Sequence, residues 1–163
     1  SMLAKGIKQP LMCLYEAAGH KIDHIRLLDN VTYDYVPEPK FVFEQPLQAL
    51  YLDLDGSLII RDQVNTRLVA LIFQCRNRSI PVTLLTRHPG DLDATLTKFR
   101  LSNLFDNIIH LTDRTIPKAH YINEENAVFV DDSFRERQAT HAQLGIRCLD
   151  PAGAACLLDE RNS

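Results

Sequence analysis

Two aspartates at the end of an apolar run have the types and spacing that chemistry requires. The run Ala49–Leu52 is followed by Asp53 and Asp55. The next residues, Gly56–Ser57, are typical of a tight turn. Alternation along an extended backbone would send both carboxylates to the same face. One carboxylate at such a strand end can attack phosphorus or bind a cation, while the second moves a proton. Taken alone, the stretch is also compatible with a strand that simply runs into an acidic turn.

Three positions further along the chain carry groups that can handle phosphate or metal. Thr86 ends a second apolar run, where its hydroxyl and nearby backbone amides can hold a phosphate oxygen. The alternative for Thr86 is a cap on a helix that starts near Asp91. Lys118 can offset the charge of a phosphoryl dianion, or it can be a solvated surface lysine. Asp131–Asp132 end a third apolar run, and they can also favour the N-terminus of the following helix.

The two residues after Thr86 are expected at the mouth of the same candidate site. Arg87 can bind a substrate anion, although an ordinary surface charge is the alternative. His88 can contact a substrate, but a solvated loop histidine is the favoured interpretation. The candidate substrate-binding residues are therefore Thr86, Arg87 and Lys118.

Convergence of the acidic residues would create strong repulsion. Like charges about 4 Å apart cost on the order of 4 kcal/mol per pair at an effective dielectric constant of about 20. A bound divalent cation would remove that repulsion, and Mg²⁺ is the usual choice where carboxylate and phosphate oxygens are the ligands. The sequence therefore predicts a Mg²⁺ cofactor.

The order of these motifs, over residues 48–150, resembles that of the haloacid dehalogenase (HAD) superfamily of phosphotransferases. The resemblance implies that Asp53 is the nucleophile, so that an aspartyl-phosphate forms on it. It also implies that Asp55 is the general acid and base, and that Asp55 gives Mg²⁺ its backbone carbonyl. The receiver fold uses a similar Asp/Thr/Lys set, but its acidic pair precedes the phosphorylated aspartate, which favours the HAD interpretation.

The remaining motifs complete the set that the resemblance implies. Thr86 matches the hydroxyl residue of the second HAD motif, and Lys118 matches the basic residue of the third. Asp131 and Asp132 match the acidic fourth motif, which holds Mg²⁺ directly or through water. The implied catalytic residues are Asp53, Asp55 and Lys118. The implied metal ligands are Asp53, Asp55, Asp131 and Asp132.

Strand-like and helical segments alternate from Ala49 onward, which predicts an α/β fold, a doubly wound parallel sheet with right-handed crossovers. The predicted strands are Tyr51–Asp53, Val82–Leu85, Asn107–His110, Ala127–Val130 and Ile146–Cys148. The predicted helices are Asp62–Arg76, Asp91–Arg100, Ser133–Leu144 and Pro151–Leu158. The strands that end at Asp53 and Asp131 must be neighbours, because otherwise their carboxylates could not share one metal ion.

The gaps between the motifs leave no room for a cap domain. Ser57 to Thr86 accommodates a flap and one helix, and Thr86 to Lys118 a helix and a short strand. Domains below about 40 residues seldom fold without added support. We therefore expect a capless HAD domain. An open site of this kind suits a large phosphorylated substrate, or a cap supplied by another subunit or domain.

Residues 1–45 do not follow the alternating pattern and are predicted to form an extension to the HAD-like domain at 46–163. Pro10–Gly19 has a helical pattern, Val31–Val36 alternates as a strand, and Lys40–Phe43 is another strand candidate. An extension packed on the sheet edge or on a helix is the simpler interpretation. The stretch Pro10–Tyr35 resembles the closing helix and strand of ATP-grasp ligase domains related to carbamoyl-phosphate synthetases. That resemblance implies an upstream ATP-grasp domain in a larger bifunctional enzyme.

Composition restricts the class of protein. The chain has 163 residues, of which 45% are hydrophobic and 24% charged, as in one globular domain. Its net charge of −3 argues against nucleic acid as a partner. No apolar stretch approaches the ~20 residues of a membrane span, and no secretory signal is visible. The four scattered cysteines predict free thiols. Together these features predict a cytoplasmic protein that binds neither membrane nor nucleic acid.

The motifs together predict a Mg²⁺-dependent phosphomonoester hydrolase that acts through an aspartyl-phosphate. One alternative is a HAD-like module that binds a phosphorylated partner or regulates an attached ligase without turnover. The presence of both Asp53 and Asp55 argues against it, because binding alone needs neither a nucleophile nor a proton donor. A phosphotransferase to an acceptor other than water is the second alternative, since it would use the same covalent intermediate.

Overall fold

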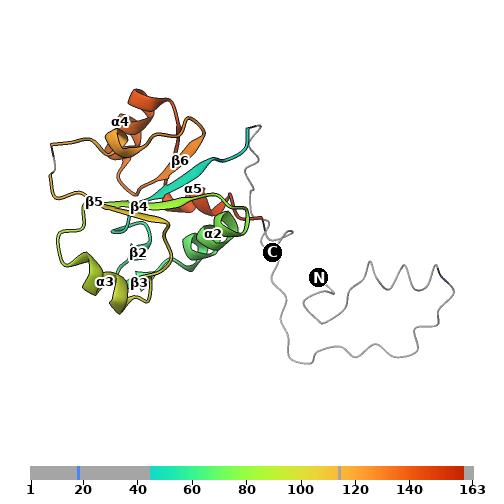
Figure 1. The fold of residues 1–163 in the computed structure, drawn as a ribbon, viewed down its shortest axis with the longest axis horizontal. Coiled ribbons are helices and arrows are strands. Elements are labelled where there is room, and N and C mark those ends of the chain that lie inside the picture. Colours follow the sequence, from blue (N-terminus) through green and yellow to red (C-terminus); the bar gives the residue numbers. More distant parts are fainter. Residues whose placement is uncertain (1–17, 19–44, 114, 160–163) are drawn as a thin grey trace. The chain divides into compact units, whose positions relative to one another are not determined.

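A five-stranded parallel sheet forms the centre of the protein (Figure 1). The computed structural model describes residues 18, 45–113 and 115–159. The strand order in the sheet is β5-β4-β1-β6-β7, and every neighbouring pair is parallel. The strands are β1 (Ala49–Leu52), β4 (Val82–Thr86), β5 (Asn107–His110), β6 (Ala127–Val130) and β7 (Arg147–Leu149). The predicted doubly wound α/β fold is confirmed.

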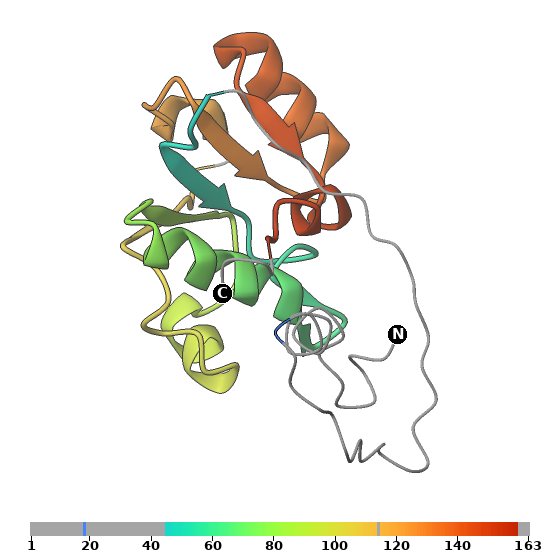
Figure 2. The same ribbon diagram turned by 90° about the vertical axis from the view of Figure 1, so that its right-hand side faces the viewer.

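Helices lie on both sides of this sheet (Figures 1 and 2). They are α2 (Thr66–Asn77), α3 (Leu92–Lys98), the 3₁₀ helix η2 (Lys118–Tyr121), α4 (Phe134–Leu144) and α5 (Pro151–Ala155). Side chains of β1 alternate between two buried clusters, one on each face. Leu50 and Leu52 pack with residues of α2, α3 and α5, whereas Ala49 and Tyr51 pack with Ile122 and other residues of the opposite face. Such two-sided burial is typical of the central strands of parallel sheets.

Strand β1 lies between β4 and β6 and sets the position of the candidate site. Leu52 is in register with Leu84 on one side and with Val130 on the other. The prediction that the strands ending at Asp53 and Asp131 are neighbours is therefore confirmed. Because parallel strands end at the same edge of the sheet, the polar residues that follow β1, β4 and β6 gather there.

A short hairpin, β2 (Ile59–Ile60) with β3 (Gln63–Val64), follows β1 and corrects one predicted helix. The predicted helix at Asp62–Arg76 begins only at Thr66, where Asn65 is the N-cap. Arg61 and Asp62 have positive φ values of 51° and 58°, as a two-residue hairpin turn of type I′ requires. The turn therefore excludes Asp62 from the helix.

The other predicted elements differ from the structure by a few residues at their ends. Helix α3 lacks Asp91 at its start and Phe99 and Arg100 at its end, because Asp91 is its N-cap and Phe99 its C-cap. Helix α5 ends at Ala155 rather than at Leu158. Between Ser57 and the start of β4 the chain holds only the hairpin and α2. Between Thr86 and Lys118 the described residues hold only α3 and β5. The expected absence of an inserted cap therefore holds for this part of the chain.

Several predictions fall outside the described residues. These are the helix at Pro10–Gly19 (of which only Ala18 is described), the strands at Val31–Val36 and Lys40–Phe43, and the thiol of Cys13. The domain boundary at residue 45 stays a prediction. Cys75, Cys148 and Cys156 are free thiols, as expected. None of the described helices combines the length and the apolar character needed to cross a membrane.

Candidate active site

Asp53 is the first residue beyond β1, and the sheet itself fixes its position. Its backbone N–H donates to the carbonyl of Val130 at 2.9 Å, so the pairing of β1 with β6 continues to the site. Asp53 is 6% exposed, and Asp131, the first residue beyond β6, is 1% exposed. Two carboxylates are therefore buried next to each other at the ends of neighbouring strands.

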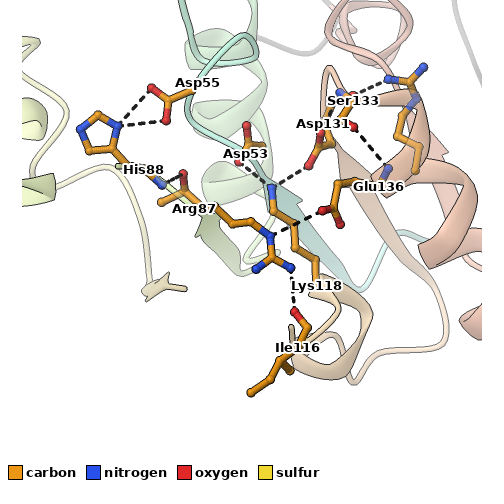
Figure 3. A network of polar contacts seen from close by, with 11 residues as sticks. Asp53, Asp55, Arg87, His88, Ile116, Lys118, Asp131, Ser133 and Glu136 are labelled. Carbon is orange, nitrogen blue, oxygen red and sulfur yellow. Dashed lines mark hydrogen bonds and ion pairs between the residues drawn. The ribbon is translucent and has the colours of Figure 1, made fainter. Parts of the chain in front are cut away.

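Lys118, from η2, bridges these two carboxylates (Figure 3). Its Nζ donates to Asp53 Oδ1 at 2.6 Å and to Asp131 Oδ2 at 2.7 Å. The lysine is itself only 3% exposed. A buried charge is tolerated where it is paired and hydrogen-bonded, as it is here on both sides. The predicted convergence of Asp53, Asp131 and Lys118 is observed.

The electrostatics of this triad leave a net negative charge. Burial, together with the nearby Asp131 carboxylate, raises the pKa of Asp53 to about 6, although Lys118 partly opposes the shift. Burial alone would lower the pKa of Lys118, but the carboxylates of Asp53 and Asp131 raise it. The lysine is therefore charged, and one ammonium faces two carboxylates that repel each other. A cation at this point would stabilise the ionised form of Asp53.

Asp132 brings a third carboxylate to the same place. Oxygens of Asp53, Asp131 and Asp132 lie within 4.8 Å of one another, which is a spacing that one metal ion can bridge. Gly56 has φ +77°, and a Cβ at this position would overlap the Asp132 carboxylate. The glycine thus permits both the turn after β1 and the close approach of Asp132. An all-carboxylate set of oxygens fits Mg²⁺ by the chemistry of its donors.

Asp55 corrects the expectation that its side chain shares a face with Asp53. Strand β1 ends at Leu52, so strand alternation does not continue through the turn to Asp55. The Asp55 carboxylate instead points to His88, whose Nδ1 lies 2.9 Å from Oδ2 and 3.1 Å from Oδ1 (Figure 3). Its side chain is 49% exposed and is not part of the three-carboxylate cluster. A metal role through the Asp55 backbone carbonyl stays a prediction.

Thr86 is the fully buried last residue of β4, next to β1. Its Oγ1 accepts a hydrogen bond from the backbone N–H of His88 at 3.2 Å. The alternative role as a helix cap is wrong, because α3 is capped by Asp91, whose carboxylate accepts from the N–H of Ala94. The hydroxyl therefore lies at the strand end where phosphate binding was predicted, while that role stays a prediction.

The guanidinium of Arg87 contacts the loop before Lys118 and the first turn of α4. Its guanidinium donates to the carbonyls of Asp113 and Ile116 at 2.8 and 2.7 Å. Its Nε lies 3.5 Å from Glu136 Oε1 (Figure 3). These contacts tie the loop before Lys118 to the start of α4. Substrate binding by Arg87 stays a prediction, and the structure shows that the residue holds the lysine-bearing loop.

Comparison with known proteins gives structural likenesses only. No protein-family model and no curated protein sequence matches the chain. Among solved structures, an uncharacterized protein from Corynebacterium glutamicum is 17% identical with a TM-score of 0.48, covering 64% of this chain and 85% of that one. The N-terminal part of BF1531 from Bacteroides fragilis, which contains a phosphatase domain complexed with Mg, is 16% identical with a TM-score of 0.49. The match covers 69% of this chain and 38% of that one.

A third likeness is to a HAD-superfamily hydrolase from Ehrlichia chaffeensis, which is 19% identical with a TM-score of 0.42, covering 59% of this chain and 52% of that one. At such low identities, and with TM-scores below 0.5, these likenesses do not establish a function for this chain.

Two residues of the site were missed or undervalued by sequence reasoning. His88 is not a solvated loop histidine: its side chain is 13% exposed and bound through both ring nitrogens. Arg137 Nη1 donates to the backbone carbonyls of Asp131 and Asp132 at 2.7 and 2.8 Å, which holds the turn that presents both carboxylates. The signal for His88 was its place two residues after Thr86. Arg137 gave no signal beyond its place in the first turns of a helix.

Proposed function

We propose that this protein is a Mg²⁺-dependent phosphomonoester hydrolase of the capless HAD type, which acts through an aspartyl-phosphate on Asp53. The observation that carries the proposal is the buried ammonium of Lys118 between Asp53 and Asp131, with Asp132 beside them. Removing three charges from water costs several kcal/mol per ion. Such an arrangement is typical of a site that must bind and transfer a charged group.

The residues of the candidate active site fit both a metal ion and a phosphoryl group. The carboxylates of Asp53, Asp131 and Asp132, with the backbone carbonyl of Asp55, would hold Mg²⁺. When bound, Mg²⁺ supplies positive charge that offsets the charge of the phosphoryl oxygens. Lys118 and the hydroxyl of Thr86, with the backbone amides near Leu54, would bind those oxygens. Donors placed in advance at the position of developing charge supply a large share of catalysis.

In the first step a carboxylate oxygen of Asp53 attacks phosphorus. The new bond joins that oxygen to phosphorus, and the ester P–O bond breaks. Asp55 gives its proton to the departing ester oxygen, which leaves as an alcohol. In the second step Asp55 accepts a proton from water while the water oxygen attacks the same phosphorus. Asp53 is released as a carboxylate, and inorganic phosphate leaves the site.

Two alternatives share the same binding groups. A phosphotransferase would pass the phosphoryl group from Asp53 to an acceptor other than water. The half-exposed side chain of Asp55 favours water, because solvent reaches the proposed base directly. A module that binds phosphate without turnover would not need Asp53 and Lys118 to be held 2.6 Å apart in a buried position. Release of inorganic phosphate distinguishes hydrolysis from both alternatives.

The test uses p-nitrophenyl phosphate with Mg²⁺. Asp53→Asn keeps the shape of the side chain but removes the nucleophile, so we expect kcat/KM to fall by at least about 10³-fold. Glu125→Gln is the matched control, because Glu125 is an exposed residue just before β6, at the opposite end of that strand from Asp131. Its activity should stay within about twofold of the wild type. Unchanged turnover in Asp53→Asn would refute the proposal.

From sequence alone we also propose that residues 1–45 belong to the end of an ATP-grasp domain and that the substrate is a phosphorylated molecule too large for a capped site. A native gene with no coding sequence upstream of Met2 would refute the first proposal. Faster hydrolysis of small phosphate esters than of phosphorylated macromolecules would contradict the second.

A further inference from the structure

His88 makes polar contacts with four other residues, two through its backbone and two through its ring. Its backbone N–H donates to Thr86 Oγ1 at 3.2 Å, and its carbonyl accepts from His110 Nε2 at 2.8 Å. Its ring Nδ1 contacts the Asp55 carboxylate, and its ring Nε2 lies 2.9 Å from Thr95 Oγ1. The ring therefore has one defined place between the turn after β1 and helix α3.

The protonation of Nδ1 follows from its partner. An ionised carboxylate can only accept hydrogen bonds, so Nδ1 must carry the hydrogen that joins His88 to Asp55. The hydroxyl of Thr95 can either donate to Nε2 or accept from it, because a hydroxyl does both. The donor role of Nδ1 is the same in each case.

Asp55 depends on this contact for its orientation. Among the described residues, His88 makes the only hydrogen bonds to the Asp55 carboxylate. The Asp55 side chain is 49% exposed, so without His88 it would sample several rotamers in solvent. Nδ1 lies slightly closer to Oδ2 (2.9 Å) than to Oδ1 (3.1 Å). A proton on Oδ1 would leave Oδ2 as the acceptor and Oδ1–H free to face a leaving group.

We infer that His88 is a positioning residue that orients Asp55 for proton transfer to the leaving oxygen. This inference rests on the proposed phosphatase function. As the ester P–O bond breaks, the transferred proton comes from Asp55, while His88 keeps the hydrogen on Nδ1 throughout. Through its backbone, His88 also links the orientation of Asp55 to Thr86, the proposed phosphate-binding hydroxyl.

A purely structural role for His88 would be to hold the loop between β4 and α3. The two roles differ in their dependence on the leaving group. An aryl phosphate such as p-nitrophenyl phosphate releases a stable phenolate and needs little help from an acid. An alkyl phosphate such as 2-phenylethyl phosphate releases an alkoxide that needs the proton, and general acids contribute about 10²- to 10⁴-fold in such cases. Damage to the loop would slow both esters equally.

The experiment measures kcat/KM for both esters with Mg²⁺, because this ratio covers the step in which the leaving group departs. His88→Ala should lower kcat/KM at least about tenfold more for the alkyl than for the aryl ester. His88→Asn should recover most of the alkyl activity, since its amide nitrogen lies near the position of Nδ1. His88→Gln, with its amide one carbon farther out, should not.

A double-mutant cycle completes the test. In the Asp55→Asn background, His88→Ala should cause no further change in the preference between the two esters. Equal losses for both esters, or Asn no better than Gln at position 88, would overturn the inference. If His88→Ala fails to fold, the comparison of Asn with Gln decides. Failure of the phosphatase function itself would appear differently, as a wild type that hydrolyses neither ester or an active Asp53→Asn.

Discussion

The carboxylates at the ends of β1 and β6 form an inner and an outer pair. The inner pair, Asp53 and Asp131, is 6% and 1% exposed and shares the ammonium of Lys118. The outer pair, Asp55 and Asp132, is exposed. Each strand end thus contributes one carboxylate to a buried position and one to the rim. A buried and an exposed carboxylate therefore lie two residues apart after β1 and are adjacent in the chain after β6.

The two environments suit two different tasks. Inside, burial and a fixed ammonium hold Asp53 and Asp131 in one geometry, which suits attack on phosphorus and metal binding. At the rim the side chains are open to solvent: His88 holds the Asp55 carboxylate, and the bare backbone of Gly56 leaves room for Asp132. The comparison predicts that changes to the inner pair affect stability and activity together, whereas changes at the rim affect function more than stability.

The largest effect is expected from Lys118→Met. Loss of the ammonium leaves two buried carboxylates without a cation, so the free energy of unfolding should fall by about 3–5 kcal/mol in metal-free buffer. The phosphatase activity should fall with it. Lys98→Met is the control, because Lys98 is 66% exposed in its ion pair with Asp62 and should contribute less than about 1 kcal/mol. Urea titration checks both variants, and equal losses for the two would contradict the buried role of Lys118.

The next effect is a pH dependence of stability in metal-free protein. The pKa of Asp53 is raised from 3.8 to about 6, so the folded state binds its proton more tightly than the unfolded state does. The resulting stabilisation is complete below about pH 4 and is lost as the pH rises through about 6. Relative to Asp53→Asn, the wild type should therefore lose on the order of 2–3 kcal/mol over that range. Urea titrations of both proteins with EDTA would contradict this if their difference did not change with pH.

The smallest expected effect distinguishes displacement of Asp132 from simple backbone strain at Gly56. Gly56 and Gly145 have similar φ values of +77° and +69°, but a Cβ at Gly145 would meet no atom within 4 Å. Both alanine variants should lose about 1 kcal/mol of stability. Only Gly56→Ala should displace Asp132 and weaken Mg²⁺ binding, by about 10-fold. Calorimetric titration with Mg²⁺ measures this, and equal affinities in the two variants would remove Asp132 from the metal site.

The fold and the inner pair could be predicted because their signals are local. Buried runs such as Ala127–Val130 mark central strands, and a parallel sheet brings the ends of neighbouring strands together. Asp53 and Asp131 therefore had to approach each other once β1 and β6 were neighbours. Lys118 followed from its place in the order of motifs.

The rim could not be predicted in the same way. Whether Asp55 faces Asp53 or His88 depends on the path of the turn at Gly56, and the expected strand alternation ended one residue before Asp53. Arg87 donates to backbone carbonyls of a distant loop. Every residue has such a carbonyl, so the residue types in that loop do not predict the contacts. Pairings of this kind depend on loop geometry rather than on a sequence pattern.

The central claim is that Asp53 becomes phosphorylated, and Asp55→Asn tests it most directly. This variant lacks the base that activates water, whereas the departure of p-nitrophenolate needs no proton. After incubation with p-nitrophenyl phosphate and Mg²⁺ and an acid quench, mass spectrometry should find one phosphoryl group on the peptide that contains Asp53. The Asp53→Asn/Asp55→Asn double variant should carry none. A phosphoryl group on another residue, or none at all while the wild type turns over, would contradict the account.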